Sequence, residues 1–364
     1  MNTDKFKIII IILFINSFSW ANPINGKYKK TKIVQKTFNI ETGSSIHIDN
    51  SYGNVSIATW NKNVANIKVT IEVSGNYNDD VIKRINDINV KIYQKNGDIY
   101  GVTNPGNTSY SYSWSLFSLF SSKKNHNISF KINYDIKMPE NNNLFIKNKY
   151  GNIFIDVLSG NLSLNADYGK FDIGELNGEN NKINIDYFSH SEIDFIKNGI
   201  IKADYSKINI ENAYNLKIIA DYTNMAIDKI RKINFSNDYG SIKINDAMQV
   251  TGKGDYQTRY FGNVNKVDFH GDYGSIKIEN IKPSFDSIIL NCDYTNVKII
   301  NENNANYKLN LSQNYGCFKY NNLNVSKDIQ DNSDRSIEAY YGNKNAKSTI
   351  RINMDYGCLK LYNN

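Results

Sequence analysis

The chain has 364 residues, of which 40% are hydrophobic and 13% aromatic, with 43 Lys and Arg against 36 Asp and Glu. This length and apolar content are sufficient for one large domain or two ordinary ones and argue against an intrinsically disordered chain. The small positive excess is spread along the whole sequence, which argues against a nucleic-acid-binding groove.

Residues 1–21 have the features of a secretory signal peptide. Two lysines precede an apolar run from Ile8 to Ile15, and Ser19 and Ala21 occupy the small-residue positions of a cleavage site. The run is far shorter than the roughly 20 residues that span a bilayer. We therefore expect an exported protein, periplasmic, at the cell surface or secreted, with no transmembrane segment after cleavage.

Residues 22–140 form an N-terminal region with mixed patterns. A first strand–corner–strand unit is expected near 33–75, and the segment 76–140 is expected to be a small α+β cap or insertion. Apolar residues at helical spacing predict a helix over Asn78–Ile88. Alternating apolar residues predict three strands, at Asn89–Tyr93, Asp98–Thr103 and Ile128–Met138.

Residues 110–120 gather aromatic side chains among serines. This segment is a candidate ligand contact, since exposed apolar patches usually mark interaction sites. The simpler interpretation is that it folds over the N-terminal cap. Its aromatic residues are Tyr110, Tyr112, Trp114, Phe117 and Phe120.

Residues 141–364 contain an internal repeat centred on a tyrosine, with spacings of 17 to 21 residues from Tyr150 to Tyr315. Apolar residues alternate on both sides of the tyrosine, as in Leu216/Ile218 and Ile208/Ile210, which is a strand period. A unit of this length cannot bury its inward face alone and must stack on its neighbours. The repeat thus predicts an all-β fold, a β-helix (β-solenoid); the LxxLxL strand of leucine-rich repeats does not recur. The repeated tyrosines are Tyr150, Tyr168, Tyr187, Tyr205, Tyr222, Tyr239, Tyr256, Tyr273, Tyr294, Tyr315 and Tyr356.

Sequence parity places each repeated tyrosine on the side of the apolar positions. We therefore expect an internal or corner aromatic ladder, with the hydroxyls reaching a turn or water; an exposed row that stacks on sugar rings is the alternative.

An acid precedes most of these tyrosines and is expected to form an outward column. A cation or basic-ligand ladder is one interpretation; we favour Asx-turns, in which each carboxylate bonds backbone N–H groups of its own corner. The calcium-binding repeat motif GGxGxDxUx is absent. The acids are Asp167, Asp186, Asp204, Asp221, Asp238, Asp255, Asp272, Asp293 and Asp355.

Catalytic and metal-binding motifs find little support in the sequence. The histidines, His47, His126, His190 and His270, are far apart and unaccompanied by a Ser or Cys motif, so no catalytic triad is proposed. Three cysteines without a CxxC pattern predict neither a disulfide framework nor a zinc site, and packing as a small residue is the favoured role of Cys292. We expect a non-enzymatic protein without a cofactor or metal.

Several stretches resemble a known family. The segment IDNSYGNVSIATW around Tyr52, the later ISFKINYDIKMPENNN and the DYG and DYT units are similar to the adhesin-like β-helix family of unknown function, common in Bacteroidetes and related to auto-transporter adhesin domains labelled head GIN. The resemblance implies an exported, right-handed, single-stranded parallel β-helix. FSH after Tyr187 and QTR after Tyr256 depart from the family pattern, which puts the local corner geometry there in question.

These observations favour an exported, non-enzymatic adhesin-like or scaffold protein of the cell envelope. It is expected to bind an extended ligand, such as a polysaccharide, along a repetitive face. One alternative is an envelope-stress or signalling accessory that contacts a membrane or protein partner through residues 108–120. The third candidate is an enzyme acting on polysaccharide.

Overall fold

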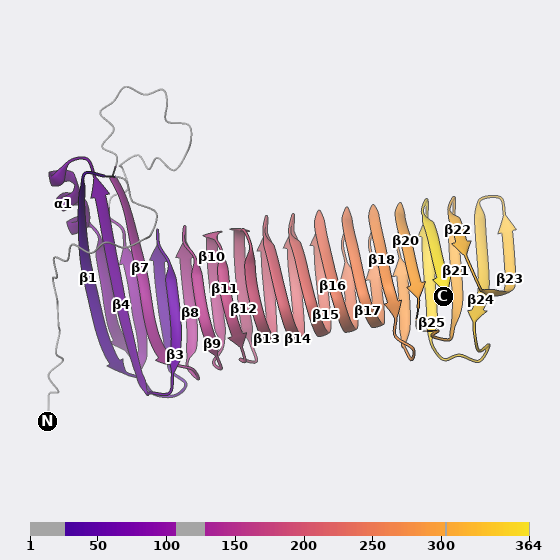
Figure 1. Cartoon of the computed structure of the whole chain (residues 1–364), viewed down its shortest axis with the longest axis horizontal. Coiled ribbons are helices and arrows are strands. Elements are labelled where there is room, and N and C mark those ends of the chain that lie inside the picture. Colours follow the sequence, from indigo (N-terminus) through magenta and orange to yellow (C-terminus); the bar gives the residue numbers. More distant parts are fainter. Residues whose placement is uncertain (1–25, 107–127, 303, 364) are drawn as a thin grey trace, which may run out of the picture. The chain divides into compact units, whose positions relative to one another are not determined.

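The computed structural model describes residues 26–106, 128–302 and 304–363 (Figure 1). The chain divides into two compact units, with the boundary between Gly174 and Glu175. The expected signal peptide and the aromatic segment 108–120 lie outside the described residues. Within the described ranges the fold is all-β except for one helix, α1. The all-β class that the repeat predicts is therefore confirmed.

The first unit begins with an antiparallel sheet and a helix. Strand β4 pairs antiparallel with both β1 and β7, α1 packs on β1 and β4, and β5 and β6 form an antiparallel pair. The predicted helix and the three predicted strands after it are confirmed, as α1, β5, β6 and β7. The bounds are β1 Tyr28–Asn39, β4 Val64–Gly75, α1 Asn78–Asp87, β5 Asn89–Lys95, β6 Asp98–Asn104 and β7 Ile128–Pro139.

The remaining strands of the first unit form parallel coils. Strand β2 pairs with β6 and β8, β3 pairs with β7 and β9, and β8 pairs with β10. Strands β2 and β8, whose register partners Ser45 and Asn143 are 98 residues apart in sequence, therefore lie on neighbouring coils. The bounds are β2 Ser45–Ser51, β3 Val55–Trp60, β8 Asn143–Lys149, β9 Ile153–Leu158 and β10 Leu162–Gly169, with β11, Phe171–Leu176, at the unit boundary.

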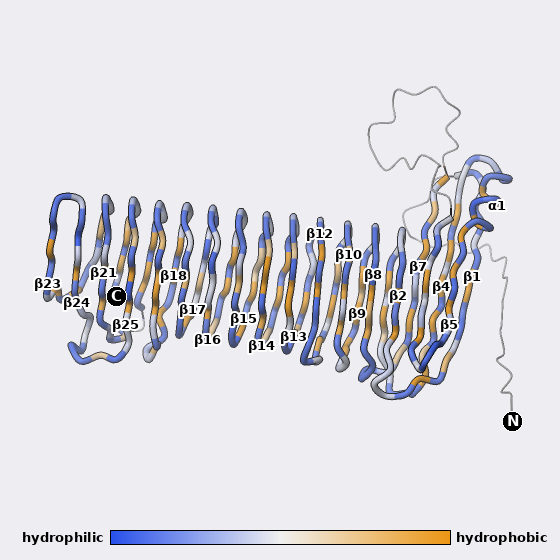
Figure 2. The backbone as a smooth tube through the Cα atoms, turned by 180° about the vertical axis from the view of Figure 1, so that it is seen from behind, coloured by the Kyte–Doolittle hydropathy of each residue, from blue (hydrophilic) through white to orange (hydrophobic). Residues whose placement is uncertain are grey.

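The second unit is a stack of parallel strands in which equivalent positions of successive repeats pair. Ile201, Ile218 and Phe235 occupy one such position on three neighbouring strands, and all three are buried. Figure 2 shows the resulting alternation of hydrophobic and hydrophilic residues along these strands. Burial of each such side chain contributes roughly 1.5–3 kcal/mol. The bounds are β12 Asn181–Phe188, β13 Ser191–Asp204, β14 Lys207–Asp221, β15 Asn224–Asp238, β16 Gly240–Lys253, β17 Gln257–His270, β18 Gly274–Ile281, β19 Ser287–Asn291 and β20 Thr295–Asn301.

The C-terminal strands of this unit do not stack in chain order. Strand β25 lies between β19 and β21, and β26 lies between β20 and β22. Three strands that precede β25 in the chain are antiparallel to one another: β21 pairs with β24, and β24 pairs with β23. The bounds are β21 Tyr307–Asn314, β22 Cys317–Tyr320, β23 Asn324–Asp331, β24 Asp334–Tyr341, β25 Thr349–Asp355 and β26 Cys358–Asn363.

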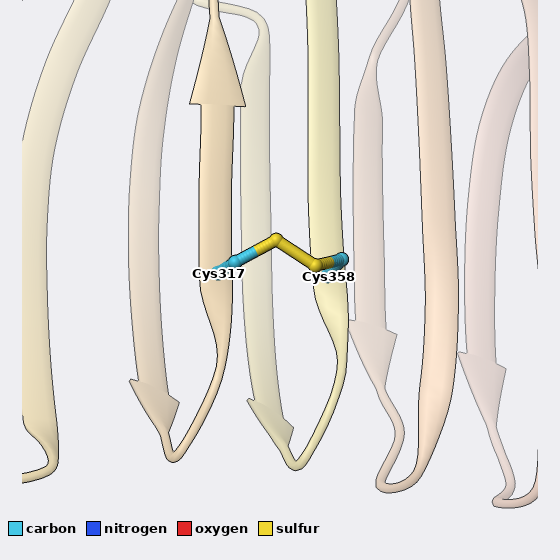
Figure 3. The surroundings of a disulfide bond; sticks show 2 residues. All are labelled: Cys317 and Cys358. Atoms are coloured by element: carbon cyan, nitrogen blue, oxygen red, sulfur yellow. A yellow bond between two sulfur atoms is a disulfide. The ribbon is translucent and has the colours of Figure 1, made fainter.

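A disulfide joins Cys317 of β22 to Cys358 of β26 (Figure 3). The two residues are partners in the strand register, with their Cα atoms 4.5 Å apart. The expectation that the cysteines form no disulfide framework is therefore wrong for this pair. The odd number of cysteines concealed it, because the third, Cys292, is free and buried.

Candidate ligand-binding face

Nine repeat tyrosines of the second unit form one continuous exposed stack, called here the tyrosine row. Neighbouring ring centroids lie 4.8–5.1 Å apart with interplanar angles of 1–7°. The side chains are 44–63% exposed. In order along the stack the row is Tyr187, Tyr205, Tyr222, Tyr239, Tyr256, Tyr273, Tyr294, Tyr356 and Tyr315.

Of the two positions expected for the ladder, internal or corner, the structure shows the corner, and the tyrosine rings are not internal. The reason is the backbone, since each tyrosine of the row has a φ of 49–58°. Side chains alternate between the two faces only along an extended strand. The left-handed conformation at the tyrosine interrupts this alternation, so the ring points outward although the apolar residues before it point inward. The corners at Tyr187 and Tyr256, where the sequence departs from the family pattern, have φ values of 58° and 55° and are like the others.

A shorter stack of the same kind occurs in the first unit. Tyr52 and Tyr150 stack at 5.3 Å, and Tyr150 and Tyr168 at 5.2 Å. All three again have positive φ values. The same corner is therefore used in both units.

The residue after most of the tyrosines closes the corner. In the DYG units it is glycine: a Cβ on Gly240 would collide with the carbonyl of Thr223 on the neighbouring coil. In the DYS and DYT units a buried hydroxyl bonds the corner carbonyl instead, as Thr223 Oγ1 does to the carbonyl of Asp221 at 2.9 Å and Ser206 Oγ to that of Asp204 at 2.7 Å. Gly, Ser and Thr are thus alternative ways of closing one corner.

Stacking determines which parts of the tyrosines are accessible. Because both faces of an interior ring are covered by its neighbours about 5 Å away, a sugar ring cannot lie flat on it. The outer edge and the phenolic hydroxyl remain in solvent. The row therefore presents hydrogen-bonding groups at the coil spacing, and stacking of sugars on its faces is not available within the row.

The aspartates before the tyrosines form a second row whose carboxylates bond from coil to coil. Oδ1 of Asp238 accepts the backbone N–H of Asp255 at 2.8 Å, and Oδ1 of Asp255 accepts that of Asp272 at 2.8 Å. The carboxylates of Asp204, Asp221, Asp272 and Asp293 each accept the backbone N–H of the aspartate on the next coil in the same way, at distances up to 3.4 Å. The favoured Asx-turn within one corner is thus replaced by a bond between coils.

No metal site is evident in the aspartate row. Among the described residues, no group of three or more His, Cys, Asp or Glu side chains is arranged to hold a metal ion. Burial, followed by the charge of Asp293, raises the pKa of Asp355. In the first unit, Asp167 pairs with Lys149 at 3.1 Å.

A polar groove of about 670 Å³ lies along this row in the second unit, lined among others by Asp255, Asp272, Lys253 and His270. Its wall includes the buried Cys292, whose thiol has a pKa raised to about 12, mainly by burial. This thiol is protonated at neutral pH and is therefore a packing residue rather than a nucleophile.

Arg259 is a fully buried cation close to this groove. Its guanidinium lies over the ring of Phe269 at 4.2 Å and donates to the carbonyl of Gly254. Burial lowers its pKa to about 10, so that it remains charged at neutral pH. The QTR sequence after Tyr256 thus changes the interior of one coil and leaves its corner intact.

The histidines that the structure describes are not brought together. His47 lies between the rings of Tyr100 and Phe145, at 4.8 and 4.5 Å, on the first unit. In the second unit, His270 lies 3.4 Å from Asp268. Sequence reasoning missed the exposed stack around His47, which Tyr93 extends at 5.2 Å from Tyr100. Only the pairing of β5, β6, β2 and β8 reveals it, because these strands are not consecutive.

The chain is similar in structure to adhesin-like proteins of Clostridium and Bacteroidetes. A "putative cell adhesion protein" from Clostridium sporogenes shares 13% sequence identity; the match covers 92% of this chain and 100% of that one, with a TM-score of 0.19. A "putative adhesin" from Parabacteroides distasonis shares 9% identity, with 91% of this chain and 97% of that one covered and a TM-score of 0.37. A "putative adhesin" from Parabacteroides merdae also shares 9% identity, with 91% of this chain and 96% of that one covered and a TM-score of 0.36. No family model and no curated protein matches the chain.

In the described residues the single helix, α1, has 10 residues and is too short and too polar to cross a membrane.

Proposed function

We propose that the chain is an exported, non-enzymatic adhesin-like protein of the cell envelope that binds an extended polysaccharide along the tyrosine row. The observation that carries this proposal is the nine-ring exposed stack in a left-handed backbone conformation. That conformation disfavours a residue with a Cβ by roughly 1–2 kcal/mol, and glycine or asparagine would adopt it more readily. Ring stacking offsets this cost, while the outer edge of each ring and its hydroxyl remain available to a ligand.

The binding mechanism would be multivalent. Each hydroxyl can donate and accept one weak hydrogen bond, and the same group recurs on the next coil at a spacing close to the length of one sugar unit in an extended chain. Once one unit of a polymer is bound, the following contacts are intramolecular, so affinity rises with polymer length. A long polymer is therefore expected to bind far more tightly than its short fragments.

Further elements of the proposal come from the sequence. They are a signal peptide at 1–21, an N-terminal region at 22–140, a repeat domain at 141–364, and a right-handed, single-stranded winding of the coils of 17–21 residues. The disulfide supports export, since such bonds persist mainly in oxidising compartments. The periplasm and the cell surface both fit, and the proposal includes neither nucleic acid nor a cofactor.

The test replaces three adjacent tyrosines of the row, Tyr222→Asn, Tyr239→Asn and Tyr256→Asn, in the mature chain. Asparagine tolerates the left-handed conformation, so the corners are retained while the rings are removed. We expect the variant to bind long glycans about tenfold or more weakly on a panel of neutral and acidic polysaccharides. Tyr214→Asn is the matched control, because Tyr214 is equally exposed but outside the row.

Two results would contradict the proposal: retention of no polysaccharide by the parent chain, or equal binding by the triple variant. Circular dichroism and reduced-thiol counts on each variant establish that the coils and the disulfide are intact.

A further inference from the structure

Four lysines stand side by side on the strand face that follows the tyrosine corner in the second unit; they are called here the lysine row. Lys277 of β18 is the register partner of Lys298 of β20, Lys298 is the partner of Lys360 of β26, and Lys360 is the partner of Lys319 of β22. Each residue is four positions after a tyrosine of the row. Like charges on directly opposed positions of neighbouring strands repel each other.

Little on the protein itself neutralises this charge. Lys277 pairs with Glu279 at 2.8 Å, and Lys298 lies over the ring of Tyr362 at 5.6 Å. Among the described residues, Lys319 and Lys360 have no acidic partner within ion-pair distance. The other outward positions of β20, β26 and β22 carry no acid. The face therefore has an excess of positive charge.

The aromatic side chain at the start of the lysine row extends it. Tyr260 occupies the equivalent position on β17, and the ammonium groups of Lys243 and Lys277 lie 5.4 and 5.3 Å from its ring centroid. These cation–π contacts hold the Lys277 side chain and add one further lysine, Lys243, in line with the row.

The disulfide holds the most crowded part of the lysine row together. Cys317 and Cys358 are two residues before Lys319 and Lys360 on the same paired strands, and their side chains also lie on the outer face. The covalent bond keeps two strands in register although they carry opposed like charges. Two like charges thus remain fixed at neighbouring positions.

On four strands a strip of neutral polar residues lies at the position two after the tyrosine: Ser241, Thr258, Ser275 and Asn296, on β16, β17, β18 and β20. On β26 and β22 the disulfide between Cys358 and Cys317 occupies this position. From corner to lysine, the face thus presents phenolic hydroxyls, then hydroxyl and amide groups, then ammonium groups. These are groups that hydrogen-bond sugar hydroxyls and pair with acidic substituents.

We infer that this face binds an anionic polysaccharide, with carboxylate or sulfate groups of successive sugar units over the lysine row. The inference rests on the proposed function and assigns the chemical class of the ligand. Charge complementarity carries it: a linear polymer of one negative charge per unit matches a line of ammonium groups on successive coils. A single-stranded nucleic acid fits less well, because bases stack on free aromatic faces and the faces of the tyrosine row are covered.

The test compares two triple variants of the full mature chain with equal charge changes. The first is Lys298→Gln, Lys319→Gln and Lys360→Gln. The matched control is Lys182→Gln, Lys217→Gln and Lys232→Gln, on strand segments before the corner, where the register partners carry no like charge. The probes are heparin, polygalacturonate, neutral dextran of similar length and single-stranded oligodeoxythymidine, at low and high ionic strength.

We expect the first variant to bind heparin or polygalacturonate about tenfold more weakly, because three modest exposed ion pairs together amount to about one tenfold step. The control should bind like the parent, and the loss should shrink at high salt. Heparin binding without polygalacturonate binding would assign sulfate as the anionic group, and the reverse would assign carboxylate; either supports the inference.

Three outcomes would overturn it. Equal weakening in both variants would show attraction by net charge alone. Equal binding of dextran and the acidic glycans by the parent would show that the lysine row does not contribute to glycan binding, whereas the proposed function of the tyrosine row would stand. Preferred binding of the oligonucleotide would assign a different macromolecule. Retention of no glycan at all is the distinct result that contradicts the proposed function itself.

Discussion

The regular coils and the terminal coils of the second unit use one repeat but are held together differently. From β13 to β17, each strand pairs with the next along nearly its whole length, and the corner bonds recur every 17 residues. In the terminal coils the strands are shorter, the last coil is inserted out of chain order, and a disulfide joins β22 to β26. The regular coils therefore depend on repeated local bonds, and the terminal coils on a single long-range closure.

The largest difference between the two regions is expected in their cores. Phe235 of β15 is 1% exposed and packs against Phe269 at 6.0 Å, whereas Phe318 of β22 is half-buried and near the end of the stack. Phe235→Ala should reduce the free energy of unfolding by about 3–5 kcal/mol. Phe318→Ala should reduce it by about half as much or less, because less apolar area leaves water on folding. Urea unfolding of both variants measures the difference, and equal losses would show that the terminal coils are packed like the regular ones.

Removal of the disulfide should affect the terminal coils selectively. Cys317→Ser with Cys358→Ser is expected to destabilise them by about 2–4 kcal/mol, because the bond closes a loop of 41 residues. Amide hydrogen exchange should accelerate in β21, β22 and β26 and remain unchanged in β14 and β15. Reduction of the parent chain serves as the control and should reproduce the pattern. Uniform acceleration over both regions would mean that the unit unfolds as one and that the distinction between them is wrong.

The regular coils could be predicted well because their pattern is local. Strand alternation alone predicts that Leu216, Ile218, Ile208 and Ile210 face the interior, and all four are buried. Alternation follows from backbone geometry within one strand, so it needs no knowledge of the neighbouring coil. Strand alternation could not predict which way the tyrosine rings point, because the positive φ at the corner interrupts the alternation.

The terminal coils were harder to predict because their order is set by tertiary contacts. Aligning the repeats on the tyrosine already places Lys277, Lys298, Lys319 and Lys360 at one position, so a charged column was within reach of the sequence. The order in which these lysines neighbour each other could not be predicted, since β26 pairs between β20 and β22 and not in chain order. The same insertion decides which strands the disulfide joins.

The smallest predicted effect concerns the charge of a single terminal strand. Lys360 stands between Lys298 and Lys319, whereas the register partners of Lys217 in the regular coils are Ile200 and Asn234. Lys360→Gln should raise the free energy of unfolding by about 0.2–1 kcal/mol at low ionic strength, because it removes one charge that is repelled by two neighbouring lysines. Lys217→Gln should leave it unchanged.

Salt provides the control for this comparison, since the distance over which exposed charges interact falls from about 10 Å at 0.1 M ionic strength to about 3 Å at 1 M. The gain from Lys360→Gln should therefore disappear at high ionic strength, as measured by thermal unfolding of both variants. A gain that persists in salt would show that packing, and not repulsion, limits the terminal coils. A destabilised Lys360→Gln variant would mean that its ammonium group already has a stabilising partner on the protein, and the lysine row would then lack the free charge that an anionic ligand requires.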